Sequence, residues 1–221
     1  MPITRAMRER HTVRAFTGKP IPADIVEAIE KRVAEINARD GLAIKLVLDD
    51  DRAFNAALKL VLAKGATNYL VLAGPATPEA EERLGYASSE LMLLVQELGL
   101  NSWWVGGTYS RGAVAKLVEG ATAIGIVVIG YGAEQGKPHR SKTAAQVSSY
   151  DGEAPAWFAE GVEAALLAPT AINRQAFAIA GRGDEVAISY RPGAFSQADL
   201  GIVKHHFELG AGAENFRWAQ G

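Results

Sequence analysis

The order of the apolar segments constrains the fold of this 221-residue chain more than any other feature. Residue spacing predicts a helix, two strands and a helix in the first half, and the same order again in the second half. The segments are 25–37, 43–48, 68–74 and 86–98, followed by 156–167, 176–181, 185–190 and 199–211. The repeated order predicts an α+β chain built from two similar halves. Ordinary α+β alternation would produce the same order by coincidence, and both explanations stay open.

Local signals place further elements between these segments. Residues 123–130 consist only of apolar residues and glycine, so both faces of a strand here would be apolar. This is typical of an interior strand covered on both faces. Residues 52–65 predict another helix. The polar segment 131–155, rich in glycine and serine, predicts a long connection.

The composition excludes several classes of function. Without cysteine, the chain has no disulfide framework, no thiolate nucleophile and no zinc site bound through sulfur. The only paired histidines, His205 and His206, lie on different faces of a helix, so no metal site is expected. A formal charge of −2 is unfavourable for nucleic-acid binding over the whole surface. The longest apolar runs are too short to cross a membrane, and the first residues lack a signal peptide, so a cytoplasmic protein is expected.

The stretch "RHTVRAF" at residues 10–16 is a basic cluster that contains a hydroxyl group. The guanidinium groups of Arg10 and Arg14 could bind a phosphate through paired hydrogen bonds, and Thr12 adds a neutral donor. On charge alone, a solvated basic arm is the simpler explanation.

Four segments, at 10–16, 98–107, 127–140 and 167–177, together resemble the FMN-dependent nitroreductase family. Its N-terminal signature is filled by Arg10, His11, Thr12, Arg14 and Phe16. The stretch "LGLNSWWVGG" at 98–107 resembles the family's helix end and flavin-facing loop, and "VVIGYGAEQGKPHR" at 127–140 resembles its late strand and the basic residues beyond. "LAPTAINRQAF" at 167–177 is similar to its asparagine loop. The resemblance implies a nitroreductase-like α+β fold, in which an antiparallel-rich sheet is packed with helices.

The resemblance also implies the residues that hold the cofactor FMN. Its phosphate would be bound by Arg10 and Thr12, with Lys137 and Arg140 from the late loop. Arg14 would lie beside flavin N1 and the C2 carbonyl, where a fixed cation stabilises the negative charge of the reduced ring. His11 would contact the ring or the ribityl chain, unless it is only a half-exposed turn histidine.

Two further groups of residues would surround the flavin ring. Gly106 and Gly107 would bring backbone close to flavin N5, and Arg14 and Gly107 are the candidate catalytic positions; a simple turn would use the same glycines. Pro169, Thr170 and Asn173 would cover the other face of the ring, unless they form only an ordinary loop after a helix, in which Asn tolerates a left-handed turn.

The sequence departs from the family pattern in an informative way. The asparagine loop normally follows the first helix, but here it follows the corresponding helix of the second half. Ala176 and Phe177 replace Pro-Trp, and Trp104 occupies a position that is often Cys or Pro. The departures imply an internal tandem pseudo-dimer, with a first half at 1–150 that keeps the signature and a second half at 151–221 that keeps the loop. One chain would then form one complete flavin site.

The expected activity is an NAD(P)H-dependent flavin oxidoreductase. NADH or NADPH would deliver hydride to flavin N5, and a small-molecule electron acceptor such as a nitroaromatic or a quinone would be reduced in the same slot. The alternative is a non-catalytic protein that binds flavin or another small ligand on the same fold. The chain would act as a monomer with an internal pseudo-two-fold or as a homodimer, without nucleic-acid or membrane partners.

Overall fold

The computed structural model describes residues 4–54 and 63–219. Its first part contains α1 Arg5–Glu9, α2 Ala23–Asp40, β1 Lys45–Val47, β2 Tyr69–Gly74, α4 Pro78–Glu97, β3 Asn101–Val105, α5 Arg111–Ala115 and β4 Thr122–Gly130. The second part contains α6 Ala144–Val147, β5 Ser148–Asp151, α7 Ala156–Ala165, the 3-10 turn η1 Ala171–Asn173, β6 Phe177–Arg182, β7 Glu185–Tyr190, α8 Ser196–Ala211, η2 Ala213–Asn215 and β8 Arg217–Trp218. Most of the helix predicted over 52–65 lies outside the described residues.

The first sheet has the strand order β1-β2-β4-β3 and is antiparallel throughout. Both of its faces are covered, as the apolar pattern of 123–130 predicted. On one face Leu70 and Leu72 of β2 pack against α2 and α4. On the other face Tyr69 and Val71 pack in a cluster that includes Val13 from the N-terminal segment. The N-terminal signature is therefore attached to the sheet and is not a free arm.

The second sheet has the order β5-β6-β7-β8, with parallel pairing at both edges and antiparallel pairing in the centre. Phe177 and Ile179 of β6 face α7 and α8, while Ala178 and Ala180 between them are exposed. The α+β class and the predominance of antiparallel pairs are confirmed. The strands are divided between two sheets, because β5 arises from the polar segment that predicted only a connection.

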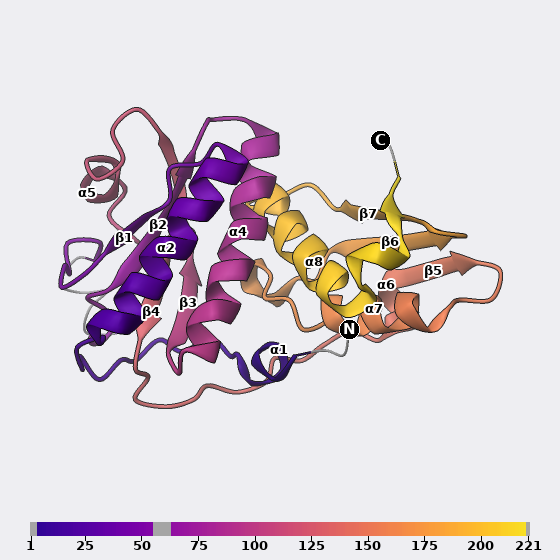
Figure 1. Ribbon diagram of the computed structural model, residues 1–221, viewed down its shortest axis with the longest axis horizontal. Helices are drawn as coiled ribbons and strands as arrows, with labels where there is room; N and C mark the ends of the chain where they lie inside the picture. Colours follow the sequence, from indigo (N-terminus) through magenta and orange to yellow (C-terminus); the bar gives the residue numbers. More distant parts are fainter. Residues whose placement is uncertain (1–3, 55–62, 220–221) are drawn as a thin grey trace.

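The two sheets are joined by the helices α4 and α8, which lie side by side in the middle of the molecule (Figure 1). Glycine permits their close approach. A Cβ added at Gly85 would lie 2.0 Å from the carbonyl oxygen of Ala198, and one added at Gly201 would lie 1.9 Å from that of Glu82. Any side chain at these two positions would force the helices apart.

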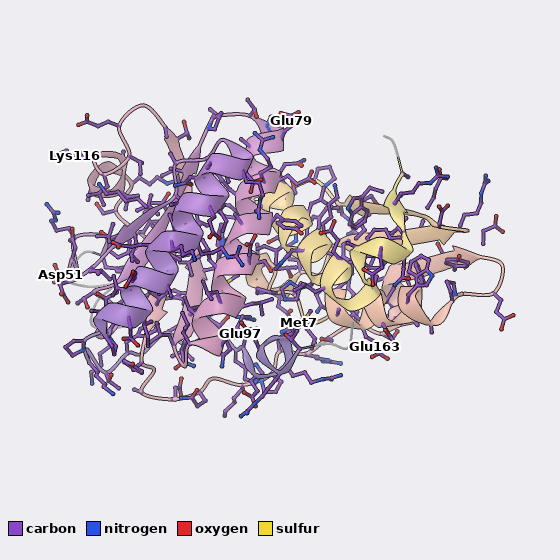
Figure 2. All side chains as sticks on the ribbon, in the orientation of Figure 1. Met7, Asp51, Glu79, Glu97, Lys116 and Glu163 are labelled. Carbon is purple, nitrogen blue, oxygen red and sulfur yellow. The ribbon has the colours of Figure 1, made fainter. Side chains whose placement is uncertain are left out.

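A smaller cluster fixes α1 beneath this helix pair. Figure 2 shows Met7 near the end of α4 at which Glu97 lies, and Met7 is buried together with Leu93 of α4 and Ala164 of α7. Residue Arg10, directly after α1, is thereby brought to the junction of the two halves.

The repeated order of elements is present, since α2-β1-β2-α4-β3 is followed by α7-β6-β7-α8-β8. The pairing of the strands is only partly repeated, because β3 pairs with β4 whereas β8 pairs with β7. The division between residues 150 and 151 falls within β5. A degenerate internal pseudo-dimer therefore stays a prediction.

Candidate functional site

A pocket of about 700 Å³ opens at the junction of the two halves. The signature segment, the end of β3, the loop after β4, the asparagine loop and the start of α8 all contribute to its wall. Of the residues predicted from the sequence, the pocket brings together Arg10, His11, Thr12, Arg14, Lys137, Pro169, Thr170 and Asn173. The remaining wall comes mainly from Trp103, Trp104, Glu134, Gly136, His139, Ala171, Ile172, Asp199 and Ile202.

The signature segment is held in an extended conformation by backbone contacts on both sides. The Val13 N–H donates to the Ser102 carbonyl of β3 at 3.2 Å, and Phe16 forms an isolated bridge with Gly132. Val13 and Phe16 are buried in the core of the first sheet. Because extended residues alternate in direction, Thr12 and Arg14 lie on the pocket side.

Arg10 is the least expected side chain of the site. It is only 4% exposed, although it lines the pocket. Within residues 4–54 and 63–219 no carboxylate pairs with it, and its Nε makes no hydrogen bond. Burial lowers the pKa of Arg10 to about 10. A buried, unpaired guanidinium is costly, so this position favours an anionic ligand. For Arg10, the explanation as part of a solvated basic arm is wrong.

Arg14 carries a second positive charge, on an exposed side chain. Its guanidinium lies 5.6 Å from the centroid of the Trp103 ring, and Trp103 is stacked on Phe54 at 6.0 Å. The aromatic face orients the cation without neutralising its charge. His11, between the two arginines, has its pKa lowered by burial and by Arg10, which favours the neutral imidazole.

The loop after β4 packs directly on the signature segment. Gly136 has φ +70°, and a Cβ at this residue would lie 2.8 Å from the Thr12 carbonyl oxygen. Glycine is thus required here for conformation and for space. The loop brings Lys137 into the wall of the pocket. Arg140 does not line it, and its carbonyl accepts a hydrogen bond from the Asn173 side chain at 2.8 Å.

The asparagine loop is strained and firmly anchored. Ile172, Asn173 and Gln175 all have positive φ, and such backbone persists only where surrounding contacts hold it. Gln175 is 1% exposed, and its side-chain oxygen accepts from the Lys142 N–H at 2.7 Å. Both alternatives for Asn173 remain open, because it lines the pocket and also occupies the left-handed turn.

Asp199 is the second anchor of this loop. Its two carboxylate oxygens accept from the Ala171 N–H at 3.0 Å, and one also accepts from the Tyr190 hydroxyl at 2.7 Å. Burial raises the pKa of Asp199 to about 6, despite these donors. Sequence reasoning missed Asp199, and it placed Gln175 in the asparagine loop without foreseeing that it anchors this loop. An acidic residue at a helix start is too common a signal to single out Asp199, and the partners of Gln175 are distant in sequence.

No metal cluster is found among the described residues, and none of the described helices is long and apolar enough to span a membrane.

A second cavity of about 740 Å³ lies over α4 between α2 and α8 and shares no wall residue with the first. Its arginines include Arg39, which pairs with Asp40 and Glu90.

The model of the family described as "Putative TM nitroreductase" matches residues 2–211. The chain belongs to this family. The resemblance seen in the four sequence segments is therefore confirmed. No functionally curated protein matches the chain.

Solved structures show the same nitroreductase-like fold. A "putative nitroreductase" from Thermotoga maritima is 21% identical with a TM-score of 0.73, and the match covers 100% of this chain and 89% of that one. A "putative nitroreductase in complex with FMN" from Desulfovibrio desulfuricans is 18% identical with a TM-score of 0.52, covering 70% of this chain and 98% of that one. At these identities the likeness establishes the fold alone.

In this member of the nitroreductase family, aromatic rings pack directly against Gly106, the first glycine of the 106–107 pair. Neither Gly106 nor Gly107 is part of the pocket wall. A Cβ on Gly106 would lie 2.4 Å from the Phe195 ring and 2.7 Å from the Trp104 ring, so these rings fill the space beside it. Trp104 lines the pocket but does not fill it, because the pocket has a volume of about 700 Å³. The roles of the two glycines toward flavin stay predictions.

Proposed function

We propose that the chain is an FMN-dependent oxidoreductase that takes hydride from NADPH or NADH and reduces a nitroaromatic, a quinone or a similar acceptor. The observation that carries this proposal is the buried guanidinium of Arg10, which has no carboxylate partner among the described residues and lines a pocket together with Arg14 and Lys137. Membership of the nitroreductase family and the FMN in the Desulfovibrio desulfuricans structure support FMN as the ligand.

The donors fit the phosphate of FMN. Arg10, Thr12 and Lys137 supply two cationic groups and a hydroxyl, as a dianion requires. Folding alone already buries the charge of Arg10, so the folded protein bears the desolvation penalty before any ligand binds. An anion that pairs with Arg10 offsets this penalty. The pocket of about 700 Å³ lies within the range of cofactor sites.

Arg14 and the asparagine loop would hold the ring system. FMN supplies the two-electron redox chemistry when it is bound. Arg14, oriented by Trp103, would hold a fixed positive charge beside the bound ring and would stabilise the negative charge of its reduced form, which is stabilisation by preorganised charge. Pro169, Thr170 and Asn173, which line the pocket, would cover the other face of the ring and exclude water from it. One such pocket would bind one FMN per chain.

Three purified proteins test the proposal. We expect the wild type to take up FMN and NADPH to bleach the flavin under anaerobic conditions. Arg10→Ala should weaken FMN binding at least about 100-fold, because it removes the charge-assisted hydrogen bonds of a buried group. Arg8→Ala is the matched control, since Arg8 is exposed on α1 and lies outside the pocket wall. Wild-type protein that takes up no FMN, or equal losses in both variants, would sink the proposal.

The alternative of a non-catalytic flavin-binding protein rests on Trp104. Its ring meets Phe195 edge to face at 5.4 Å and lines the pocket, where it would compete for space with a nicotinamide or an acceptor. Bound flavin that NADPH and NADH leave oxidised would favour the binding protein. Recovery of reduction in Trp104→Ala would identify the ring as the obstacle.

A further inference from the structure

Two buried nitrogen atoms without a hydrogen-bond partner lie behind the pocket: Nε of Arg10 and Nε2 of His206. The residues are 4% and 1% exposed. His206 is one helical turn beyond Ile202 on α8, and Ile202 lines the pocket together with Arg10, so His206 lies on the same side of α8 as this wall. The two groups also interact electrostatically, because Arg10 is one cause of the lowered pKa of His206, after burial and His205.

The hydrogen bonds of His206 determine which ring nitrogen carries its proton. Nδ1 lies 3.1 Å from the Ile202 carbonyl oxygen and 3.0 Å from the Ser89 hydroxyl oxygen. A carbonyl oxygen can only accept, so Nδ1 of His206 must be the protonated nitrogen. Burial and the neighbouring Arg10, His205 and His139 keep the ring neutral. Nε2 is therefore an unprotonated acceptor.

The contacts of Ser89 are compatible with the same tautomer. Its oxygen accepts from Nδ1 of His206, and its single hydrogen is then available for Nδ1 of His205, which lies 2.8 Å away. Both histidines and Ser89 are buried between α4 and α8. The direction of donation thus runs from His206 through Ser89 to His205, and it leaves no proton for Nε2 of His206.

A donor and an acceptor thus remain unsatisfied in the same part of the interior. Nε–H of Arg10 can only donate, and Nε2 of His206 can only accept. The two terminal nitrogens of Arg10 are not among the buried atoms without a partner, so they keep access to the pocket. Groups of this kind that do not bond directly are commonly joined by one buried water.

We infer that His206 is a positioning residue for Arg10: its unprotonated Nε2 holds Nε–H of Arg10 through one buried water, which leaves the two terminal nitrogens for an anion. The inference rests on the proposed function, in that the anion is taken to be the phosphate of FMN. Neutral His206 satisfies the inner donor of Arg10 without a second charge. A carboxylate at the same place would neutralise Arg10 and weaken its attraction for the phosphate.

The tautomer can be tested in FMN-free protein by 15N NMR of labelled histidine. We expect His206 to show a protonated Nδ1 and a pyridine-like Nε2 near neutral pH. A protonated Nε2 would overturn the inference, whether or not the protein binds flavin. This measurement needs no variant and so does not depend on the folding of an altered core.

FMN affinity tests the consequence. His206→Phe keeps an aromatic ring but loses the acceptor, and we expect binding about tenfold weaker, the effect of losing a hydrogen bond to a charged group. His206→Gln restores an acceptor oxygen and should bind within about threefold of wild type. His205→Phe is the matched control, because His205 is the next residue of α8 and is also buried, but it lies at the far end of the chain of hydrogen bonds.

The outcomes separate the two proposals. Wild-type affinity in His206→Phe, or an equal loss in His205→Phe, contradicts the role of His206. If His206→Phe does not fold, a His206→Gln variant with wild-type affinity together with the expected tautomer supports the role, and one with a tenfold loss contradicts it. A wild type that binds no FMN counts against the proposed function alone. Inorganic phosphate then replaces FMN as the probe, and the same order of affinities is expected.

Discussion

Substituting Gly201 by Ala should open the junction on which the pocket depends. The added Cβ would lie 1.9 Å from the Glu82 carbonyl oxygen, and contacts below 3.0 Å are essentially never seen for real Cβ atoms. The opposing atom is helix backbone, so no change of rotamer relieves the contact. The axes of α4 and α8 would have to separate by about 1 Å. Gly201 lies between Asp199 and Ile202, so the pocket wall moves with it.

The expected loss of stability follows from this displacement. Overpacking of a well-packed core costs about 1–3 kcal/mol, and a gap of about 1 Å further weakens the dispersion contacts along both helices. Replacing a helical glycine by alanine returns at most about 1 kcal/mol. We therefore expect Gly201→Ala to lower the free energy of unfolding by about 3 kcal/mol, equivalent to a melting temperature lower by roughly 6–12 °C for a chain of this size.

Urea unfolding followed by circular dichroism measures the change, and FMN affinity reports the effect on the site. Gly112→Ala is the matched control, because Gly112 is in helix α5 and a Cβ there would meet nothing within 4 Å. It should leave stability unchanged or raise it slightly. Gly85→Ala, whose Cβ would lie 2.0 Å from the Ala198 oxygen, should resemble Gly201→Ala. A Gly201→Ala protein within 1 kcal/mol of wild type would refute the reasoning about the helix contact.

Three further predictions concern strain and buried charge. Ile172 is 91% exposed and has φ +47°, a left-handed conformation that Asn tolerates better than a β-branched residue. Ile172→Asn should therefore raise the free energy of unfolding by about 1 kcal/mol, whereas Ile172→Val should not. Thermal unfolding measures both variants, and an equal gain in both would contradict backbone strain at this residue. Burial raises the pKa of Asp199 from 3.8 to about 6. The stabilising contribution of the protonated group is therefore present below about pH 4 and is lost as pH rises to 6, by up to ~3 kcal/mol. Urea unfolding at several pH values should show this loss in the difference in free energy of unfolding between wild type and Asp199→Asn. Burial lowers the pKa of His205 to about 4, so its contribution is present above about pH 6.5 and is lost as pH falls toward 4; His205→Phe should lose less stability than wild type over that range, and an identical pH profile would refute the assignment.

Most elements with regular apolar spacing could be predicted from the sequence, because burial on one or both faces imposes that spacing. The helix predicted at 25–37 is α2, and it ends at Gly41, which has φ +64°. The strand predicted at 123–130 is β4 with one residue added. The helix predicted at 86–98 begins eight residues earlier, because Thr77 caps it and Pro78 opens it. Polar residues of the first two turns had hidden that start.

Elements whose burial depends on distant partners could not be predicted. β3 contains two adjacent tryptophans, Trp103 and Trp104, which pack on opposite faces of the first sheet. Residues 98–107 were interpreted as a helix end and a loop from their resemblance to the family, so this strand was missed. β5 is polar, and it is a strand only because β6 pairs with it in parallel. Such edge strands carry little signal of their own.

The candidate site was predictable where a short segment carries its own chemistry, and unpredictable where a role depends on another segment. The basic signature and the asparagine loop were found from local patterns, although more than 150 residues separate them. The desolvation penalty of the Arg10 guanidinium could not be inferred from the sequence. Only the folded chain shows that this group is buried and that no described carboxylate pairs with it. For the same reason the packing of Phe195 and Trp104 beside Gly106 could not be foreseen, and the role of this glycine toward flavin stays a prediction.

The position of the asparagine loop also argues for one flavin per chain. The described pocket combines the signature of the first half with the loop that follows α7. A second pocket of the same kind would need an equivalent loop after α2. There the chain turns at Gly41, and the Asn37 side chain bonds both backbone groups of Ile44, which leads directly into β1. No space is left for a loop that could cover a ring. Flavin released from the loaded, purified protein should therefore approach one per chain, and a ratio of two would contradict this reasoning.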